Sequence, residues 1–353
     1  MEAYKAEGGP PGSVIWLVTS ACNMNCMHCY VSRWRGRLRE LGSRGRMRLA
    51  EEMVDAGVDW VAVTGGEPLI LPDIWDVLRL LSRGGVEVGV NTNALLLDAG
   101  RAAKLSSHVS TVYVSIDGSR ETHEAMRRCR GCYARVVEAV KTLTRVGVEV
   151  VPVMAVSRIN AAAVKNYIGL AADMGLGEAA IIPVMPQGEA IRTGIWVDAQ
   201  TYNRAVVEAA AEARERGVRL WLWCTPYAPA LRLPADTVTY TNCRLSDTVD
   251  LDPAGGILLC DVLDIVLADA AGLGFTRAAE EAESHPLTRL VERPELTGPC
   301  RSCPYRWECL GGCYARSLII RGGLNAGDPL CPLAGGAAGE DGAGEHEKDG
   351  YKH

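Results

Sequence analysis

Residues 14–30 read VIWLVTSACNMNCMHCY, an apolar run followed at once by three cysteines. The run at 14–19 is short and rich in β-branched and aromatic residues, which predicts a buried β-strand. Cys22, Cys26 and Cys29 follow it with the spacing Cys-x3-Cys-x2-Cys. In a parallel barrel the carboxyl ends of the strands face the active site, so the strand would hold this cysteine loop where chemistry takes place.

The alternation of strand and helix patterns continues to about residue 224. Amphipathic segments such as 73–81, 133–146 and 202–216 have apolar residues at helical spacing. Strand–helix alternation with continuous apolar strands predicts an α/β fold, a parallel sheet covered by helices. About six units would form a partial (β/α)6-type parallel barrel, although periodicity alone leaves a doubly wound sheet open. The predicted strands are 14–19, 60–64, 86–91, 111–116, 148–156, 179–184 and 218–223.

The pattern changes after about residue 225, where helical periodicity becomes scarce and turns appear beside cysteines. We therefore predict a barrel domain at 14–224 and a small cysteine-rich domain at 225–335, held together by metal rather than by a large core. Residues 1–13 form an N-terminal extension. Residues 336–353 are rich in Gly and charge without an apolar period, which predicts a disordered tail.

The composition excludes several classes of protein. Apolar residues make up 48% and charged residues 23%, as in ordinary globular proteins. The net charge of -6 provides no basic footprint for nucleic acid or an anionic membrane surface. No apolar run is long enough to span a membrane, and the N-terminus lacks a signal pattern. We expect a cytoplasmic protein.

The chain has 13 cysteines, grouped at short spacings. Disulfides are rare in cytosolic proteins other than those of hyperthermophiles, so metal or cluster binding is the stronger interpretation. Three thiolates in the first loop can hold three irons of a cubane and leave the fourth iron open. A structural zinc site more often closes all four positions, and a purely redox cluster is a further alternative.

This cysteine loop, followed by Tyr30, resembles the signature of radical SAM enzymes. In that family the three cysteines hold a [4Fe–4S] cluster whose open iron binds S-adenosyl-L-methionine. An electron then breaks a C–S bond and yields a 5′-deoxyadenosyl radical. The resemblance implies that Cys22, Cys26 and Cys29 are the cluster ligands, that Tyr30 lies beside the adenine, and that a ferredoxin or flavodoxin supplies electrons.

Further segments of the chain agree with the resemblance. Gly65-Gly66-Glu67-Pro68 resembles the family's GGEP segment, in which the glycines let the backbone approach a ligand and Glu67 would pair with the cofactor's ammonium group. A tight turn is the alternative for this segment. Asn93 ends the third predicted strand and would face the cofactor.

Ser115 ends the fourth predicted strand and, by the same resemblance, would bind the ribose. Arg127 would pair with the cofactor carboxylate as a fork-shaped donor. From its spacing alone, Arg127 is equally compatible with a solvated helix surface.

A second set of seven cysteines resembles the SPASM extension of radical SAM enzymes, which binds two auxiliary [4Fe–4S] clusters. By this resemblance one cluster is held by Cys243, Cys260 and Cys313. The other is held by Cys300, Cys303, Cys309 and Cys331.

The first auxiliary cluster lacks a fourth cysteine in this assignment. Cys224 is the candidate, against the alternatives of a buried core thiol or an open iron that binds substrate. Two zinc sites are the alternative for the whole region. Cys129-x-x-Cys132 is left open between a disulfide and a weak metal site, and we expect neither cysteine to be catalytic.

Asp261 directly follows Cys260, and SPASM enzymes that oxidise peptidyl serine or cysteine place an Asp there as proton acceptor. A turn-capping Asp is the alternative. The predicted activity is hydrogen abstraction from a peptide or protein side chain, giving an oxidation or a crosslink. A tetrapyrrole substrate, as in radical SAM proteins of haem biosynthesis, is the second possibility. A non-catalytic iron–sulfur electron carrier or zinc scaffold is the alternative of another class.

Overall fold

The computed structural model describes residues 11–334 and contains one curved sheet of eleven strands. The strand order is β11-β10-β9-β1-β2-β3-β4-β5-β6-β7-β8. Neighbouring strands from β1 to β8 are all parallel and follow the order of the chain. These strands are β1 (Ser13–Thr19), β2 (Trp60–Gly65), β3 (Glu87–Thr92), β4 (Thr111–Ser115), β5 (Glu149–Val156), β6 (Glu178–Pro183), β7 (Arg219–Leu222) and β8 (Val238–Tyr240).

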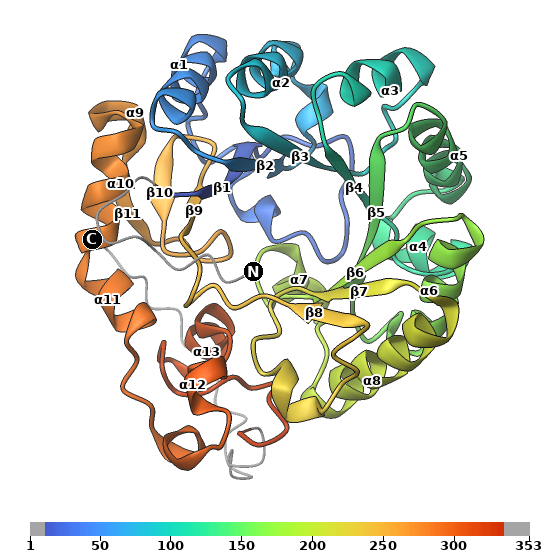
Figure 1. Ribbon diagram of the computed structural model, residues 1–353, viewed down its shortest axis with the longest axis vertical. Helices are drawn as coiled ribbons and strands as arrows, with labels where there is room; N and C mark the ends of the chain where they lie inside the picture. The colour runs from blue at the N-terminus through green and yellow to red at the C-terminus, as the bar shows by residue number, and fades with distance from the viewer. Residues whose placement is uncertain (1–10, 335–353) are drawn as a thin grey trace.

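Helices pack around the outside of this curved sheet, and the cysteine loop after β1 lies on its inner side (Figure 1). Burial on both faces explains why β1 is a continuous apolar run, with Trp16, Leu17 and Val18 fully buried. The helices of this part are α1 (Ser43–Asp55), α2 (Ile74–Arg83), α3 (Ala99–Ser106), α4 (Arg120–Arg127), α5 (Cys132–Arg145), α6 (Val164–Asp173), α7 (Glu189–Thr193) and α8 (Ala199–Arg216).

The predicted partial parallel barrel is confirmed. All seven predicted strands are present, with ends that differ by at most one residue. The sequential strand order excludes the doubly wound alternative, in which the order reverses at a switch point. The sheet extends beyond six units because the three-residue strand β8, too short to show a period, pairs with β7.

The chain after residue 225 joins the same sheet. β9 (Thr248–Leu251) pairs in parallel with β1, and β10 (Gly256–Leu258) and β11 (Val266–Asp269) continue the sheet as antiparallel strands. The boundary between two domains near residue 224 therefore stays a prediction. Residues 336–353, predicted as a disordered tail, lie outside the described residues, as do residues 1–10.

The expectation that helices are scarce after residue 225 is wrong. α10 buries Phe275, Ala278, Ala279 and Ala282. Three of these four are alanines, which contribute little apolar signal to a periodicity search. The helices of this part are α9 (Ala270–Leu273), α10 (Phe275–Ser284), α11 (Pro286–Glu292), α12 (Arg306–Cys309) and α13 (Tyr314–Arg321).

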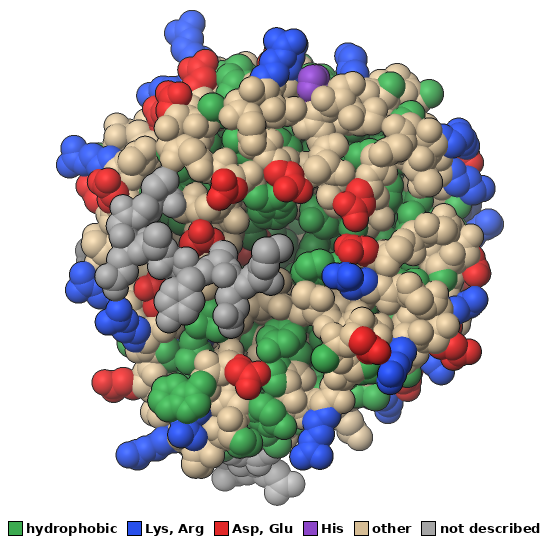
Figure 2. Space-filling model, viewed as in Figure 1, with side chains coloured by type: hydrophobic (Ala, Val, Ile, Leu, Met, Phe, Trp, Pro, Cys, Tyr) green, Lys and Arg blue, Asp and Glu red, His purple; other side chains and the backbone are tan. Residues whose placement is uncertain are grey.

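The surface carries its basic groups mainly at the rim. On the face in Figure 2, Lys and Arg side chains lie around the edge, while Asp and Glu side chains surround the central part. Within residues 11–334, none of the helices has the length and apolar character that crossing a membrane requires.

Candidate active site

The three cysteines of the first loop lie between β1 and the short helix η1 (Val31–Arg33). Cys26 is buried, and Cys22 and Cys29 are partly exposed. Burial, with smaller contributions from the thiols of Cys29 and Cys22, raises the pKa of the Cys26 thiol to about 11 against the opposing charge of Arg127. Cys22 and Cys29 also pack in one apolar cluster with Cys26, as ligands of a single metal cluster would.

Gly65 and Gly66 pack against the start of this loop. A Cβ on Gly65 would lie 2.3 Å from the Thr19 carbonyl oxygen, and one on Gly66 would lie 2.1 Å from that of Ala21. Gly65 also has a φ of +128°. The Gly66 amide donates to the Thr19 carbonyl at 2.7 Å. Contact with the cysteine loop thus explains why glycine is required at both positions. The approach of these glycines to a ligand stays a prediction.

Glu67 is fully buried and joins β2 to the end of β3. Its carboxylate accepts hydrogen bonds from the Leu69 amide at 3.1 Å, the Thr92 hydroxyl at 2.8 Å and the Asn93 amide at 2.8 Å. The Asn93 side-chain amide in turn donates to Asn23 at 2.7 Å and lies 3.8 Å from the Cys22 sulfur. Glu67 therefore positions Asn93 beside the cysteine loop, and its predicted contact with a cofactor ammonium group stays a prediction.

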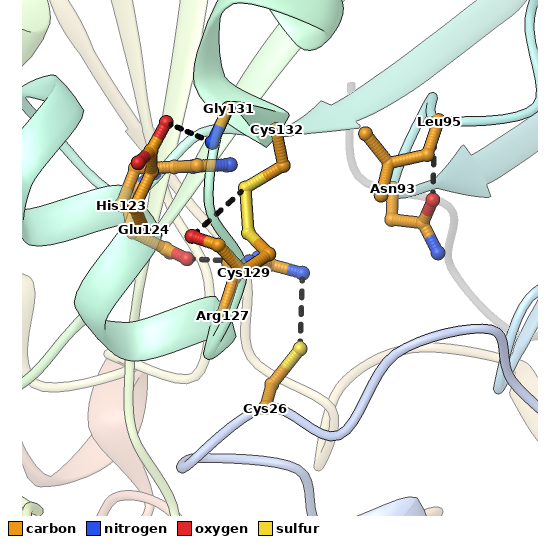
Figure 3. The surroundings of a disulfide bond; sticks show 10 residues. Cys26, Asn93, Leu95, His123, Glu124, Arg127, Cys129, Gly131 and Cys132 are labelled. Carbon is orange, nitrogen blue, oxygen red and sulfur yellow. Dashed lines mark hydrogen bonds and ion pairs between the residues drawn. A yellow bond between two sulfur atoms is a disulfide. The ribbon is translucent and has the colours of Figure 1, made fainter.

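Arg127 is a buried residue and not a solvated one, which removes the surface alternative. Its Nε donates to Asp117 Oδ2 at 2.6 Å. Its Nη1 donates to the Cys26 sulfur at 3.9 Å (Figure 3). Burial acts to raise the pKa of Asp117, but the charge of Arg127 outweighs it and holds the pKa at about 2. Asp117 thus fixes the guanidinium toward the cysteines.

No role of its own was predicted for Asp117 from the sequence, although it lies two residues after β4. Its second carboxylate oxygen accepts a hydrogen bond from the Ala155 amide at 3.0 Å, which anchors it to β5. Ser115, the predicted ribose contact, lies partly buried at the carboxyl end of β4. A polar residue just beyond a predicted strand end was the available signal for Asp117.

Tyr30 connects the first cysteine loop to Asp261, 231 residues away. The Tyr30 hydroxyl donates to Asp261 Oδ2 at 2.6 Å. The Cys260 sulfur lies 3.7 Å from the other carboxylate oxygen of Asp261, and the Asp261 amide donates to Asp250 at 2.7 Å. Tyr30 was expected beside a cofactor adenine, and the structure places its hydroxyl on this carboxylate. Asp250 was not foreseen, because only the pairing of β9 with β10 brings it here.

The two neighbouring carboxyl groups hold protons more tightly than exposed ones. Burial, and then the charge of Asp261, raise the pKa of Asp250 well above its usual value. Burial raises the pKa of Asp261, although the hydrogen bond from Tyr30 opposes the shift. A carboxylate in such a setting is a better proton acceptor than one in water.

Four C-terminal cysteines surround one cavity. Its walls include Arg306 and the backbone near Gly311, and its lining thiols are those of Cys300, Cys303, Cys309 and Cys331. A closed set of four thiols suits a cubane or a zinc ion. The structure therefore brings together the four cysteines that were predicted to share a cluster.

The other auxiliary set comes together around Cys313 at the start of α13. Burial raises the pKa of Cys224 well above its usual value, followed by the charges of Cys313 and Cys243. The same two thiols also raise the pKa of Cys260. Cys224 has a φ of +51°, a strained conformation for a residue other than glycine. Cys224 is thus close enough to Cys243 and Cys313 for their charges to act on it, and its role as a fourth ligand stays a prediction.

An ion pair that the sequence did not indicate holds both auxiliary sets. Arg316 and Asp328 are both essentially fully buried and form two hydrogen bonds, at 2.8 and 2.6 Å. Arg316 also donates to the Cys224 carbonyl at 2.9 Å. Asp328 accepts from the Cys313 amide at 3.0 Å and from the amide of Leu330, next to Cys331, at 3.0 Å. One buried pair thus positions cysteines of both sets.

Residues 16–168 match the radical SAM superfamily. This chain carries a radical SAM domain. Mycofactocin maturase MftC of Mycobacterium ulcerans is 27% identical over 339 residues, covering 93% of this chain and 89% of that protein. The AdoMet-dependent heme synthase of Methanosarcina barkeri is 25% identical, covering 91% of this chain and 96% of that protein.

A solved structure shows the same fold. SuiB of Streptococcus suis, bound to its precursor peptide SuiA, superposes with a TM-score of 0.72 at 16% identity. The match covers 92% of this chain and 76% of that one. The prediction of a radical SAM enzyme is confirmed, and the carrier and scaffold alternatives lose their support. The family implies a [4Fe–4S] cluster and S-adenosylmethionine. The residues present fit that cofactor, because Cys22, Cys26 and Cys29 share one packed cluster and the Arg127 guanidinium is directed at the Cys26 sulfur.

Proposed function

We propose that this radical SAM enzyme removes hydrogen from a peptide or protein side chain, in an oxidation or crosslinking reaction of the maturase type. The observation that carries the proposal is the contact of Asp261 with both Tyr30 and Cys260. It places a carboxyl of raised pKa between the radical cysteine loop and an auxiliary cysteine set. The maturase name of the MftC relative and the peptide bound to SuiB support this substrate class.

In this proposal the described residues divide into holding and reacting groups. Cys22, Cys26 and Cys29 hold the first cluster, while Asn93, Ser115 and Arg127 hold S-adenosylmethionine. When bound, these cofactors supply the radical that removes a hydrogen atom, and two auxiliary [4Fe–4S] clusters supply electron acceptors. A ferredoxin or flavodoxin in the cytoplasm is the electron donor. The auxiliary ligands are Cys224, Cys243, Cys260 and Cys313 for one cluster and Cys300, Cys303, Cys309 and Cys331 for the other.

Asp261 takes up the proton that the substrate loses as it is oxidised. Its Oδ2 accepts the Tyr30 hydroxyl, so the carboxylate is oriented and its other oxygen remains beside Cys260. Arg33 adds to this orientation by donating to the Asp261 carbonyl at 2.7 Å and to the Tyr30 carbonyl at 2.7 Å. Burial raises the pKa of Asp261, which makes it a better proton acceptor than an exposed carboxylate.

A tetrapyrrole substrate is the second candidate because the heme synthase relative covers nearly the whole chain. The spacing of Cys309 and Cys313 argues against it, since three residues separate them where haem-pathway proteins usually have two. We therefore rank it below a peptide substrate.

Replacing Asp261 by Asn tests the proposal in the anaerobically reconstituted enzyme with a candidate precursor peptide. Asn keeps the shape of Asp but cannot take up a proton at neutral pH. Formation of 5′-deoxyadenosine should continue, while modified peptide should fall by roughly 10²–10⁴-fold, the usual contribution of a positioned general base.

Asp269→Asn is the matched control, because Asp269 is an exposed Asp at the end of β11. It should give product at the wild-type rate. Wild-type product yield from Asp261→Asn would end the proton-acceptor role. Conversion of a tetrapyrrole side chain, with every peptide unreactive, would replace the substrate class.

A further inference from the structure

Cys129 and Cys132 form a disulfide in the short connection between α4 and α5 (Figure 3). Their Cα atoms are 5.9 Å apart. Arg128 and Gly131 in the same connection both have positive φ angles, 51° and 75°, so the chain makes a tight turn that brings the two sulfurs together. The pair takes no part in the function proposed above.

A buried histidine is directed at this pair. His123 on α4 is 1% exposed, and its ring points toward the disulfide (Figure 3). One ring nitrogen lies within 4.8 Å of both sulfurs. Nδ1 accepts a hydrogen bond from the Asp117 amide at 3.2 Å, whereas Nε2 is buried without a hydrogen-bond partner among the described residues. A buried N–H without a hydrogen-bond partner costs free energy, so it destabilises the disulfide form of this site.

The hydrogen bonding of His123 separates a redox site from a metal site. Because Nδ1 accepts the Asp117 amide hydrogen, the proton of the neutral ring is on Nε2. A metal needs the Nε2 lone pair, which this tautomer does not offer. An N–H directed at sulfur instead suits a thiolate, which would accept the hydrogen bond that is missing in the disulfide state.

The two sulfurs differ in access. Cys129 is partly exposed and lies between the exposed residues Arg128 and Arg130. Cys132 is 3% exposed and is the first residue of the 14-residue helix α5. The helix N-terminus and the N–H of His123 both stabilise negative charge on Cys132. Cys129 is thus the sulfur that a reagent can reach, and Cys132 is the better leaving group.

We propose that Cys129 and Cys132 form a redox-active site that exchanges electrons with an external dithiol. A thiolate of the dithiol attacks the Cys129 sulfur, the S–S bond breaks, and its electron pair goes to Cys132. The second thiolate of the dithiol then attacks its own sulfur in the mixed disulfide and releases Cys129. The two protons of the external dithiol pass to Cys129 and Cys132. The protein disulfide is thereby reduced to two thiols, and the external dithiol is oxidised to a disulfide.

The pair lies against the first cysteine loop. Cys132 packs in one apolar cluster with Met24 and Cys26. Cys129 lies two residues after Arg127, whose guanidinium donates to the Cys26 sulfur. The proposed exchange itself uses neither Asp261 nor the auxiliary cysteines, so it can be tested without a peptide substrate.

Equilibration of the cluster-loaded enzyme with mixtures of reduced and oxidised dithiothreitol, without oxygen, tests the proposal. Alkylation and mass spectrometry then count the thiols at Cys129 and Cys132. A reversible two-electron transition at these two positions, absent from Cys129→Ser/Cys132→Ser, is expected. A disulfide that persists in excess dithiol, thiols that persist in excess disulfide, or one zinc ion per chain lost in the double variant would overturn the proposal.

Two histidine variants test the part played by His123. Asn has an acceptor in the place of Nδ1 and lacks Nε2–H, so His123→Asn should disfavour the reduced form about tenfold, which is about 30 mV for two electrons. His123→Gln carries an N–H that reaches the Nε2 position and should stay near the wild-type potential. Equal potentials in wild type and His123→Asn would show that the histidine does not act on the pair.

Discussion

The two cysteine regions of this chain are built in opposite ways. The first loop takes three thiols from eight consecutive residues and sets them directly after β1, so local sequence contains nearly all of its chemistry. The auxiliary sets take thiols from residues 224 to 331. They meet only because β9 returns beside β1 and because Arg316 and Asp328 pair in the interior.

The difference also appears in the buried charges. Asp117 and Arg127 are ten residues apart. Asp117 lies just after β4, and Arg127 is the last residue of the next helix, α4. Arg316 reaches across from α13 to the carbonyl of Cys224, 92 residues away. A contiguous site needs few tertiary contacts to form, whereas a dispersed one depends on each buried anchor. The variants below test that contrast.

The largest effect is expected from replacing Cys22, Cys26 and Cys29 together by Ala. Reductive cleavage of S-adenosylmethionine should be abolished, because no other described thiols lie in that loop. The auxiliary clusters should remain, so that the variant keeps about eight of the about twelve irons expected per wild-type chain. Metal analysis and 5′-deoxyadenosine formation measure the two effects. Persistent 5′-deoxyadenosine, or two zinc ions per chain in place of auxiliary iron, would contradict the division into independent regions.

Arg316→Met should destabilise the fold by about 3–5 kcal/mol, because it leaves the Asp328 carboxylate buried without its partner. Auxiliary iron should fall while the first cluster remains. Urea unfolding and iron content measure these effects. The matched control is Arg214→Met, which breaks an exposed ion pair with Asp236 and should change stability by less than about 1 kcal/mol. Equal losses in the two variants would remove the anchor role of Arg316.

The smallest expected effect is on how the free energy of unfolding depends on pH, through His123 near the first cysteine loop. Burial lowers the pKa of His123 to about 4, below its unfolded value of about 6.5. The unfolded chain therefore binds a proton first, so this stability is complete above pH 6.5 and is lost as the pH falls toward 4. Between pH 7.5 and 5.5 the loss should be about 1 kcal/mol.

His123→Asn should remove that part of the pH dependence, measured as the difference in unfolding free energy between the two pH values. His108→Asn, at a partly exposed histidine after α3, is the control and should leave the dependence as it is. An unchanged slope in His123→Asn would show that the buried ring is not the source.

The barrel strands could be predicted because each is a short apolar run whose burial on both faces is visible residue by residue. The helices after residue 225 could not, because α10 buries alanines and α13 buries Arg316 and Ser317, which no apolar period indicates. The first cysteines and the glycines of the GGEP segment were visible as motifs. The contact of Tyr30 with Asp261 was not, because a hydrogen bond across 231 residues has no local pattern.

The sequence by itself determined the family, the parallel sheet and the grouping of the cysteines into motifs, because these depend on residue type and short spacing. Tertiary structure alone decided which charges are buried and what they hold. Asp117 fixes Arg127, Glu67 fixes Asn93, and Asp328 with Arg316 anchors the auxiliary cysteines. The physical reason is that a buried charge is stable only when its partners arrive from elsewhere in the fold, and those partners are set by packing rather than by spacing.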